Sequence, residues 1–138
     1  MIILDTNVLS ALMRQVPDQD VVTWLDQQPR TSVWTTSVTV FEIRFGLQIL
    51  AVGKRRTLLT EAFEELLARM GRQVVTFDVA AAGHASDLMA DRHRRGRPTD
   101  LRDTMIAGIA LAQHAMLATR NTVHFEDTSI PLVNPWIV

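Results

Sequence analysis

Residues 1–10, MIILDTNVLS, join a short apolar run to the first turn of a helix. The run Ile2–Leu4 is apolar at every position, which is typical of a strand that is buried on both faces of a sheet. Asp5–Asn7 follows directly and consists of residues that favour the start of a helix. Val8–Leu12 then carries apolar residues at helical spacing. The stretch therefore predicts a buried strand that passes straight into a helix.

The rest of the chain repeats this alternation. Further strands are predicted at residues 32–36, 73–77, 115–118 and 130–133. Helices are predicted from Pro17-Asp18 to about residue 25, from a cap at Ser37 to a stop at Gly53, and over residues 55–70, 79–93 and 100–113. The alternation favours an α/β fold in a single domain over residues 1–138, with a mainly parallel sheet covered by helices on both faces. Ligands of such sheets bind beyond the carboxyl ends of the strands, where Asp5 and Asn121 are placed.

Composition narrows the chemistry that the chain can perform. The 138 residues carry a net charge of −1, so a polyanion such as nucleic acid would need a local basic patch. The absence of cysteine excludes disulfides, thiolate metal sites and cysteine nucleophiles, and leaves carboxylate and imidazole as metal ligands. The N-terminus has no basic leader and no apolar run is long enough to span a membrane, so we expect a cytoplasmic protein.

Three acidic residues lie at the boundaries of predicted buried elements. Asp5 ends the first strand, where it either projects into a crevice or simply caps the next helix. Glu42 lies in an apolar helix, where a carboxylate is costly without a cation or a hydrogen-bond donor, although an isolated helical Glu is usually solvated. Asp103 follows Asp100 in a first helical turn, where both acids suit the helix dipole, but its spacing places it near the apolar side. Together the three acids can assemble a Mg²⁺ site of a few carboxylates and several waters.

Basic residues and histidines give weaker indications. The best candidates for phosphate contacts are Arg92, Arg94, Arg95 and Arg97, followed by residues 54–56. The alternative is that arginine abundance has no functional meaning, since the chain has thirteen arginines and one lysine. The four histidines lack the spacing of a metal-binding motif and are not predicted to be catalytic: His84, His93, His114 and His124.

Several segments carry a family resemblance. They are ILDTNVLS (3–10), TTSVTVFEIRFGL (35–47), RPTDLRDTMIAGIALA (97–112), LATRNTVHF (117–125) and LVNPW (132–136). In this order the chain resembles the PIN-domain ribonucleases, particularly the VapC toxins of bacterial toxin–antitoxin pairs and their FitB-like branch. The resemblance implies an α/β/α sandwich, Mg²⁺ or Mn²⁺ as cofactor and cleavage of RNA.

The resemblance also assigns roles to individual residues. It matches Asp5, Glu42 and Asp103 to the family's first three acids. Asp5 and Asp103 would hold the metal that polarises the scissile phosphate, while Glu42 orients or deprotonates the attacking water. Thr6 and Asn121 would support the carboxylates or the substrate, and Asp100 is a further supporting residue.

The family's fourth acid has no counterpart at the expected positions. The sequence has Asn121 directly after Thr119-Arg120 and His124 three residues later, whereas Glu126 and Asp127 have the wrong spacing. We therefore expect one well-occupied metal and a weak second one.

A partner is also implied by the resemblance. It is a cognate antitoxin of the VapB kind that binds operator DNA, and it is expected to cover exposed apolar residues such as Trp24, Trp34 and Leu47. A homodimer is expected as well. Two other functions stay open: an aspartate-nucleophile phosphatase built on Asp5, which Asn7 disfavours, and a non-catalytic module that binds RNA or protein.

Overall fold

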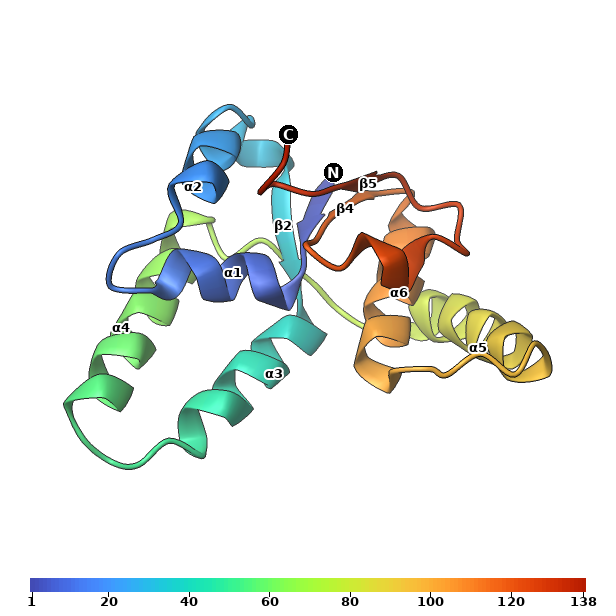
Figure 1. Cartoon of the computed structure of the whole chain (residues 1–138), viewed down its shortest axis with the longest axis horizontal. Helices are drawn as coiled ribbons and strands as arrows, with labels where there is room; N and C mark the ends of the chain where they lie inside the picture. Colours follow the sequence, from blue (N-terminus) through green and yellow to red (C-terminus); the bar gives the residue numbers. More distant parts are fainter.

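Five parallel strands form one sheet in the order β3-β2-β1-β4-β5, in a computed structural model that describes residues 1–138 (Figure 1). The strands are β1 (Ile2–Leu4), β2 (Val33–Thr36), β3 (Val74–Val75), β4 (Met116–Ala118) and β5 (Leu132–Val133). The chain builds outward from β1 through β2 to β3, and then returns to the other side of β1 for β4 and β5. Such a reversal of strand order opens a crevice at the carboxyl ends of β1 and β4. The predicted parallel α/β fold is confirmed.

Helices cover both faces of this sheet. Six are α-helical: α1 (Thr6–Met13), α2 (Gln19–Asp26), α3 (Ser37–Gln48), α4 (Lys54–Arg69), α5 (Val79–Arg94) and α6 (Leu101–Gln113). Two short 3-10 helices that the sequence did not predict are η1 (Arg30–Ser32) and η2 (Thr122–Phe125). None of these helices combines the length and the apolar run that crossing a membrane requires.

The core is divided between the two faces. Because successive strand side chains point to opposite faces, Leu4 packs with α1, α2 and α4, whereas Ile3 packs with α6 and the start of α5. Figure 1 shows α5 and α6 side by side, away from α1 and α4. Gly108 allows this close contact, since a Cβ there would lie 2.5 Å from the carbonyl oxygen of Ala81. The tight α5–α6 pair gives the start of α6, where Asp103 lies, a rigid support.

The structure corrects two predicted helix ends. Thr36, not Ser37, caps α3, because its hydroxyl accepts a hydrogen bond from the Thr39 amide at 3.1 Å. The hydroxyl of Ser37 instead accepts from the amide of Phe77 at 3.1 Å and links α3 to the segment after β3. Gly53 does not end α3, which stops at Gln48; it is the residue before α4.

Candidate active site

A polar cleft of about 350 Å³ opens beyond the carboxyl ends of β1 and β4. Its lining contains the three predicted acids, Asp5 after β1, Glu42 on α3 and Asp103 on α6. The other lining residues are polar or amphipathic: Thr6, Asn7, Ser10, Arg14, Arg120, Asn121 and Trp136. Side chains that are up to 98 positions apart along the chain, Asp5 and Asp103, are therefore brought to one site.

Asp5 combines both roles that the sequence left open. Its carboxylate accepts a hydrogen bond from the Thr6 amide at 2.8 Å, as the residue before α1, and it also lies in the cleft lining. The residue is 3% exposed, and burial raises the pKa of the Asp5 carboxyl to about 6. Hydrogen bonds from Thr119 and Thr6 oppose this shift, while the charges of Asp103 and Glu42 add to it.

Glu42 faces the cleft from the first half of α3. The hydroxyl of Thr6, which was predicted to be a supporting residue, donates to Glu42 Oε1 at 2.9 Å. Arg102 approaches Glu42 Oε2 at 3.5 Å from α6. Partial burial still raises the pKa of Glu42, with the Thr6 hydrogen bond and Arg102 opposing the shift and the charges of Asp103 and Asp100 adding to it. Glu42 therefore lies in the same cleft as Asp5, and one of its carboxylate oxygens is held by the Thr6 hydroxyl.

Asp103 lies on the first turn of α6 and is half-buried. Its backbone amide is capped by the carboxylate of Asp100 at 3.0 Å, so Asp100 shapes the helix start rather than lining the acid cleft. One oxygen of Asp103, Oδ2, contacts Nδ1 of His124 at 2.9 Å. Thus His124 reaches the site through Asp103, while Asn121 lines the cleft without bonding to a carboxylate through its side chain.

Thr119 and Asn7 are site residues that the sequence analysis missed. The buried hydroxyl of Thr119 donates to Asp5 Oδ2 at 2.7 Å, and the amide of Asn7 reaches both Asp5 Oδ2 and the Thr119 hydroxyl at 3.3 Å. Thr119 directly follows β4 as Asp5 directly follows β1, and the two strands are neighbours. Thr119 could therefore have been identified from the sequence, because it follows its strand directly, as Asp5 does.

The donor set fits a hard divalent cation. The acids of the cleft offer only carboxylate oxygens, which suit Mg²⁺ and Mn²⁺. No three His, Asp or Glu side chains are grouped closely enough to enclose a metal ion by themselves. Mg²⁺ is usually bound by one or two carboxylates together with waters, so an open cleft with Asp5 and Asp103 on its walls suits such a site better than a closed cage would.

Most of the arginines that were predicted to contact RNA form ion pairs with Asp127 instead. Arg92 is 3% exposed, and its guanidinium donates to both carboxylate oxygens of Asp127 at 2.9 Å and to the backbone carbonyl of His124 at 2.8 Å. Arg95 and Arg97 also reach Asp127, each at 3.1 Å. The prediction of Arg92 as an RNA contact is therefore wrong, because a buried, fully paired guanidinium is not available to a phosphate. Of the four arginines, Arg94 alone is exposed and makes no ion pair.

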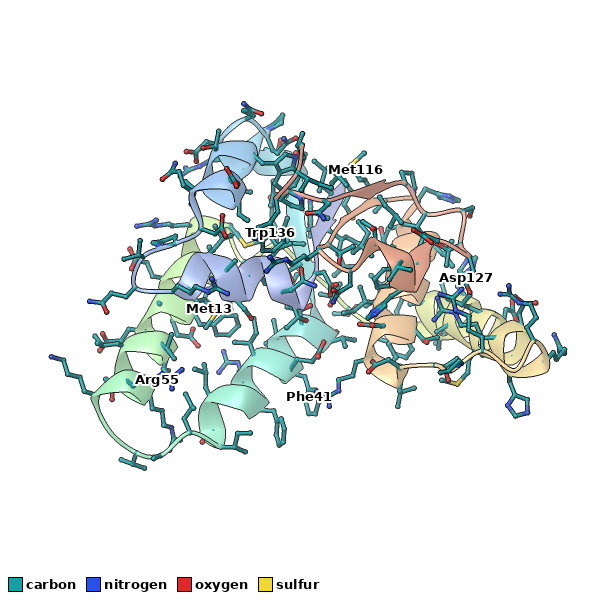
Figure 2. The ribbon with its side chains drawn as sticks, in the orientation of Figure 1. Met13, Phe41, Arg55, Met116, Asp127 and Trp136 are labelled. Atoms are coloured by element: carbon teal, nitrogen blue, oxygen red, sulfur yellow. The ribbon has the colours of Figure 1, made fainter.

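The predicted partner surface also needs correction. Trp24 and Leu47 are buried, at 6% and 7% exposure, because they pack into the core beneath α1 and α4. Exposed apolar side chains gather instead on α3, where Phe41 and Phe45 are stacked and are 60% and 48% exposed. They line an apolar groove between α3 and α6. Figure 2 shows Phe41 pointing away from the sheet.

Comparison with known proteins agrees with this geometry. A family model described as PIN domain matches residues 2–130. The chain is 39% identical to VapC ribonuclease Y4jK of Sinorhizobium fredii, covering 99% of this chain and 98% of that protein, and 32% identical to toxin FitB of Neisseria gonorrhoeae, covering 99% of each. Among solved structures, that of FitAcB from Neisseria gonorrhoeae superposes with a TM-score of 0.89 over 100% of both chains at 32% identity.

Proposed function

Because the chain belongs to the PIN-domain family and, within it, to the VapC- and FitB-like proteins, we propose that it is a metal-dependent ribonuclease and the toxin of a toxin–antitoxin pair. The observation that carries this proposal is the meeting of Asp5, Glu42 and Asp103 in one cleft. The raised pKa values of Asp5 and Glu42 support it, since burying like charges together is unfavourable unless a cation joins them.

Each acid has a chemical task in this proposal. Asp5 and Asp103 would hold the cation, and Mg²⁺ or Mn²⁺ supplies there the charge that polarises a phosphodiester and acidifies a water. Glu42, held by the Thr6 hydroxyl, orients the attacking water and accepts its proton. Thr119 and Asn7 hold the carboxylate of Asp5 in one orientation.

Cleavage of labelled RNA by the purified protein tests the proposal. We expect products with Mg²⁺ or Mn²⁺, none with EDTA, and none from Asp103→Asn, which is nearly isosteric but loses a ligand charge. Unchanged circular dichroism and melting temperature of the variant would confirm that its fold is intact. Equal activity in variant and wild type, after contaminating nuclease is excluded, would refute the assignment. RNA binding without cleavage would instead favour a non-catalytic PIN module.

A protein partner completes the proposed biology. Solved complexes of similar chains include FitAB bound to a DNA fragment and DNA-bound VapBC from Salmonella typhimurium, at TM-scores of 0.89 and 0.80 and identities of 32% and 25%. By analogy, we propose a DNA-binding antitoxin for this chain, and a homodimer of the toxin itself. Co-expression with the neighbouring gene, followed by purification and sedimentation of the untagged protein, tests both. A toxin that co-purifies with nothing and sediments as a monomer would contradict this part of the proposal.

A further inference from the structure

Two arginines line the acid cleft without a carboxylate partner. Arg14 follows α1 directly and Arg120 lies two residues after β4, and both belong to the lining of the cleft that contains Asp5. Both are exposed, and neither forms an ion pair within the chain. Most of the arginines that the sequence singled out share Asp127 instead. The free positive charge nearest the acids is therefore on this wall of the cleft.

Arg120 is held in a fixed place on this wall. Its guanidinium lies over the ring of Trp136, 4.9 Å from the ring centroid. The indole of Trp136 is anchored in turn, because its N–H donates to Asp18 Oδ2 at 3.0 Å. The backbone amide of Arg120 donates to the side-chain oxygen of Asn7 at 3.1 Å, and Asn7 also bonds to Asp5. Figure 2 shows Trp136 beside α1, the helix that Arg14 directly follows.

From this arrangement we propose that Arg14, Arg120 and Trp136 form the binding wall for single-stranded RNA, an inference that rests on the proposed ribonuclease function. Arg14 and Arg120 contact phosphate oxygens next to the scissile bond. Trp136 is a positioning residue: it keeps the guanidinium of Arg120 flat, with one face covered by the indole and the other open to a base.

Electrostatics gives the reason for such a wall. The chain has a net charge of −1, and the floor of the cleft has three carboxylates that repel a phosphodiester. Two unpaired guanidinium groups on the rim oppose this repulsion and hold the strand over the acids. Arginine suits the task better than lysine, since its planar fork bonds to phosphate with two N–H groups and also stacks on aromatic rings and bases.

RNA binding by variants without cleavage activity tests the wall directly. The probe is a 5′-fluorescein-labelled single-stranded RNA of about 12 nucleotides and mixed sequence, a length within the site sizes of single-strand binders. Its anisotropy is measured with the Asp103→Asn protein in Mg²⁺. Adding Arg14→Ala or Arg120→Ala should each weaken binding roughly tenfold. Each should also lower the slope of log K against log salt by about 0.7.

Matched variants separate the wall from general surface charge. Arg30→Ala removes an exposed arginine of η1 that forms no ion pair and lies outside the cleft, and it should leave binding unchanged. Trp136→Phe keeps an aromatic ring under Arg120 but loses the N–H bond to Asp18, so it should bind more tightly than Trp136→Leu, which should approach Arg120→Ala. In the catalytically intact protein, Arg120→Ala should raise KM and leave kcat nearly unchanged, because it removes binding shared by substrate and transition state.

Several results would overturn the inference. Parent-like binding by both Arg14→Ala and Arg120→Ala would do so, as would an equal loss in Arg30→Ala. Loss of antitoxin binding with unchanged RNA binding would assign the wall to the protein partner instead. If the Asp103→Asn protein does not bind RNA and the wild type does not cleave it, both the proposed ribonuclease function and the binding wall are rejected. If the wild type cleaves RNA but the arginine substitutions change neither binding nor KM, only the binding wall is rejected.

Discussion

Two clusters of charge stand at the same end of the sheet and have opposite compositions. The acid cleft gathers Asp5, Glu42 and Asp103, and burial raises the pKa values of Asp5 and Glu42. In the second cluster, which we call the Asp127 cluster, three arginines surround Asp127, and hydrogen bonding from Arg92 lowers the pKa of that carboxyl to about 2. Figure 2 shows Asp127 beside α5, well away from Trp136 on the cleft side. The carboxylate of Asp127 is paired with arginines of the fold, whereas Asp5 in the acid cleft has no basic partner within the chain.

The two clusters are joined through η2. Arg92 donates to the backbone carbonyl of His124, and the ring of His124 contacts Asp103. The Asp127 cluster therefore holds in place the segment that touches one acid of the cleft. This connection explains how an ion pair outside the cleft can affect the geometry within it.

The largest effect is expected from Arg92→Met. It leaves the carboxylate of Asp127, 5% exposed, without its main partner and should lower the free energy of unfolding by about 3 kcal/mol, since breaking a buried pair is strongly unfavourable. Urea denaturation followed by circular dichroism measures this. Arg95→Ala, which removes an exposed partner of the same acid, should cost about 1 kcal/mol or less. Adding Asp127→Leu to Arg92→Met should restore much of the lost free energy of unfolding. If Arg92→Met and Arg95→Ala lowered the free energy of unfolding by similar amounts, the predicted difference between buried and exposed partners would be wrong.

Opposite pH dependence of the two clusters is the next effect. The pKa of Asp5 is raised from 3.8 to about 6, so the native state holds a proton that the unfolded chain has lost. In metal-free protein, Asp5 should therefore reduce stability by about 3 kcal/mol as pH rises from 4 to 7. The lowered pKa of Asp127 acts in reverse, because its stabilisation is present above pH 4 and is lost as pH falls toward 2.

Melting curves at several pH values in EDTA test this pH dependence. Asp5→Asn should remove most of the decline in stability between pH 4 and 7. It should leave unchanged the loss of stability below pH 4 that comes from Asp127. Mg²⁺ should raise the stability of the wild type at pH 7 by binding to the native state, with little effect on Asp5→Asn. If the stability of the metal-free wild type rose steadily from pH 4 to 7, the prediction that ionised Asp5 destabilises the native state would be wrong.

A smaller effect is expected at the hydrogen bond that orients Asp5. Thr119→Val removes the hydroxyl that donates to Asp5 Oδ2 and should weaken Mn²⁺ binding about 10- to 100-fold, measured by titration calorimetry. Thr35→Val is the matched control, since Thr35 is equally buried but donates to the carbonyl of Leu4 rather than to an acid. Equal Mn²⁺ affinities in the two variants would show that Thr119 does not support a metal ligand.

The smallest effect concerns a second cation. Because Asn121 and His124, rather than a fourth acid, lie next to the three acids, we expect one well-occupied ion on Asp5 and Asp103. Activity with Mn²⁺ should at least equal that with Mg²⁺, and Asn121→Asp should bind a second ion more tightly. Asn121→Ala, which offers no ligand, is the control. Calorimetry that detects two tight Mg²⁺ ions on the RNA-free wild type would be contrary to this. Glu126 would then be the first residue to examine, because Asp127 is bound by arginines.

Local sequence patterns were enough to predict most helices and strands and the three acids of the cleft. Apolar runs and helical spacing report burial, so β1, α1 and the parallel α/β class could be predicted, and so could the placement of Asp5 at a strand end. Family-like segments identified Glu42 and Asp103. The cap of α3 could not be predicted from the sequence, because Thr36 and Ser37 are neighbours that can both cap a helix. The amide of Phe77, forty residues after Ser37, donates to the Ser37 hydroxyl, and Thr36 is left as the cap.

Only the tertiary structure decided which charges are paired. The sequence predicts that Arg92, which lies in a run of arginines, is a cation at the surface. In the folded chain it is packed against Asp127, which is 35 residues away. Arg120 is unremarkable in sequence, but the fold sets it over Trp136 in the acid cleft. The physical reason is that periodicity reports how a residue meets its own helix or strand. The partner of a charge depends instead on how distant segments pack, and this distinguishes a structural ion pair from a binding site.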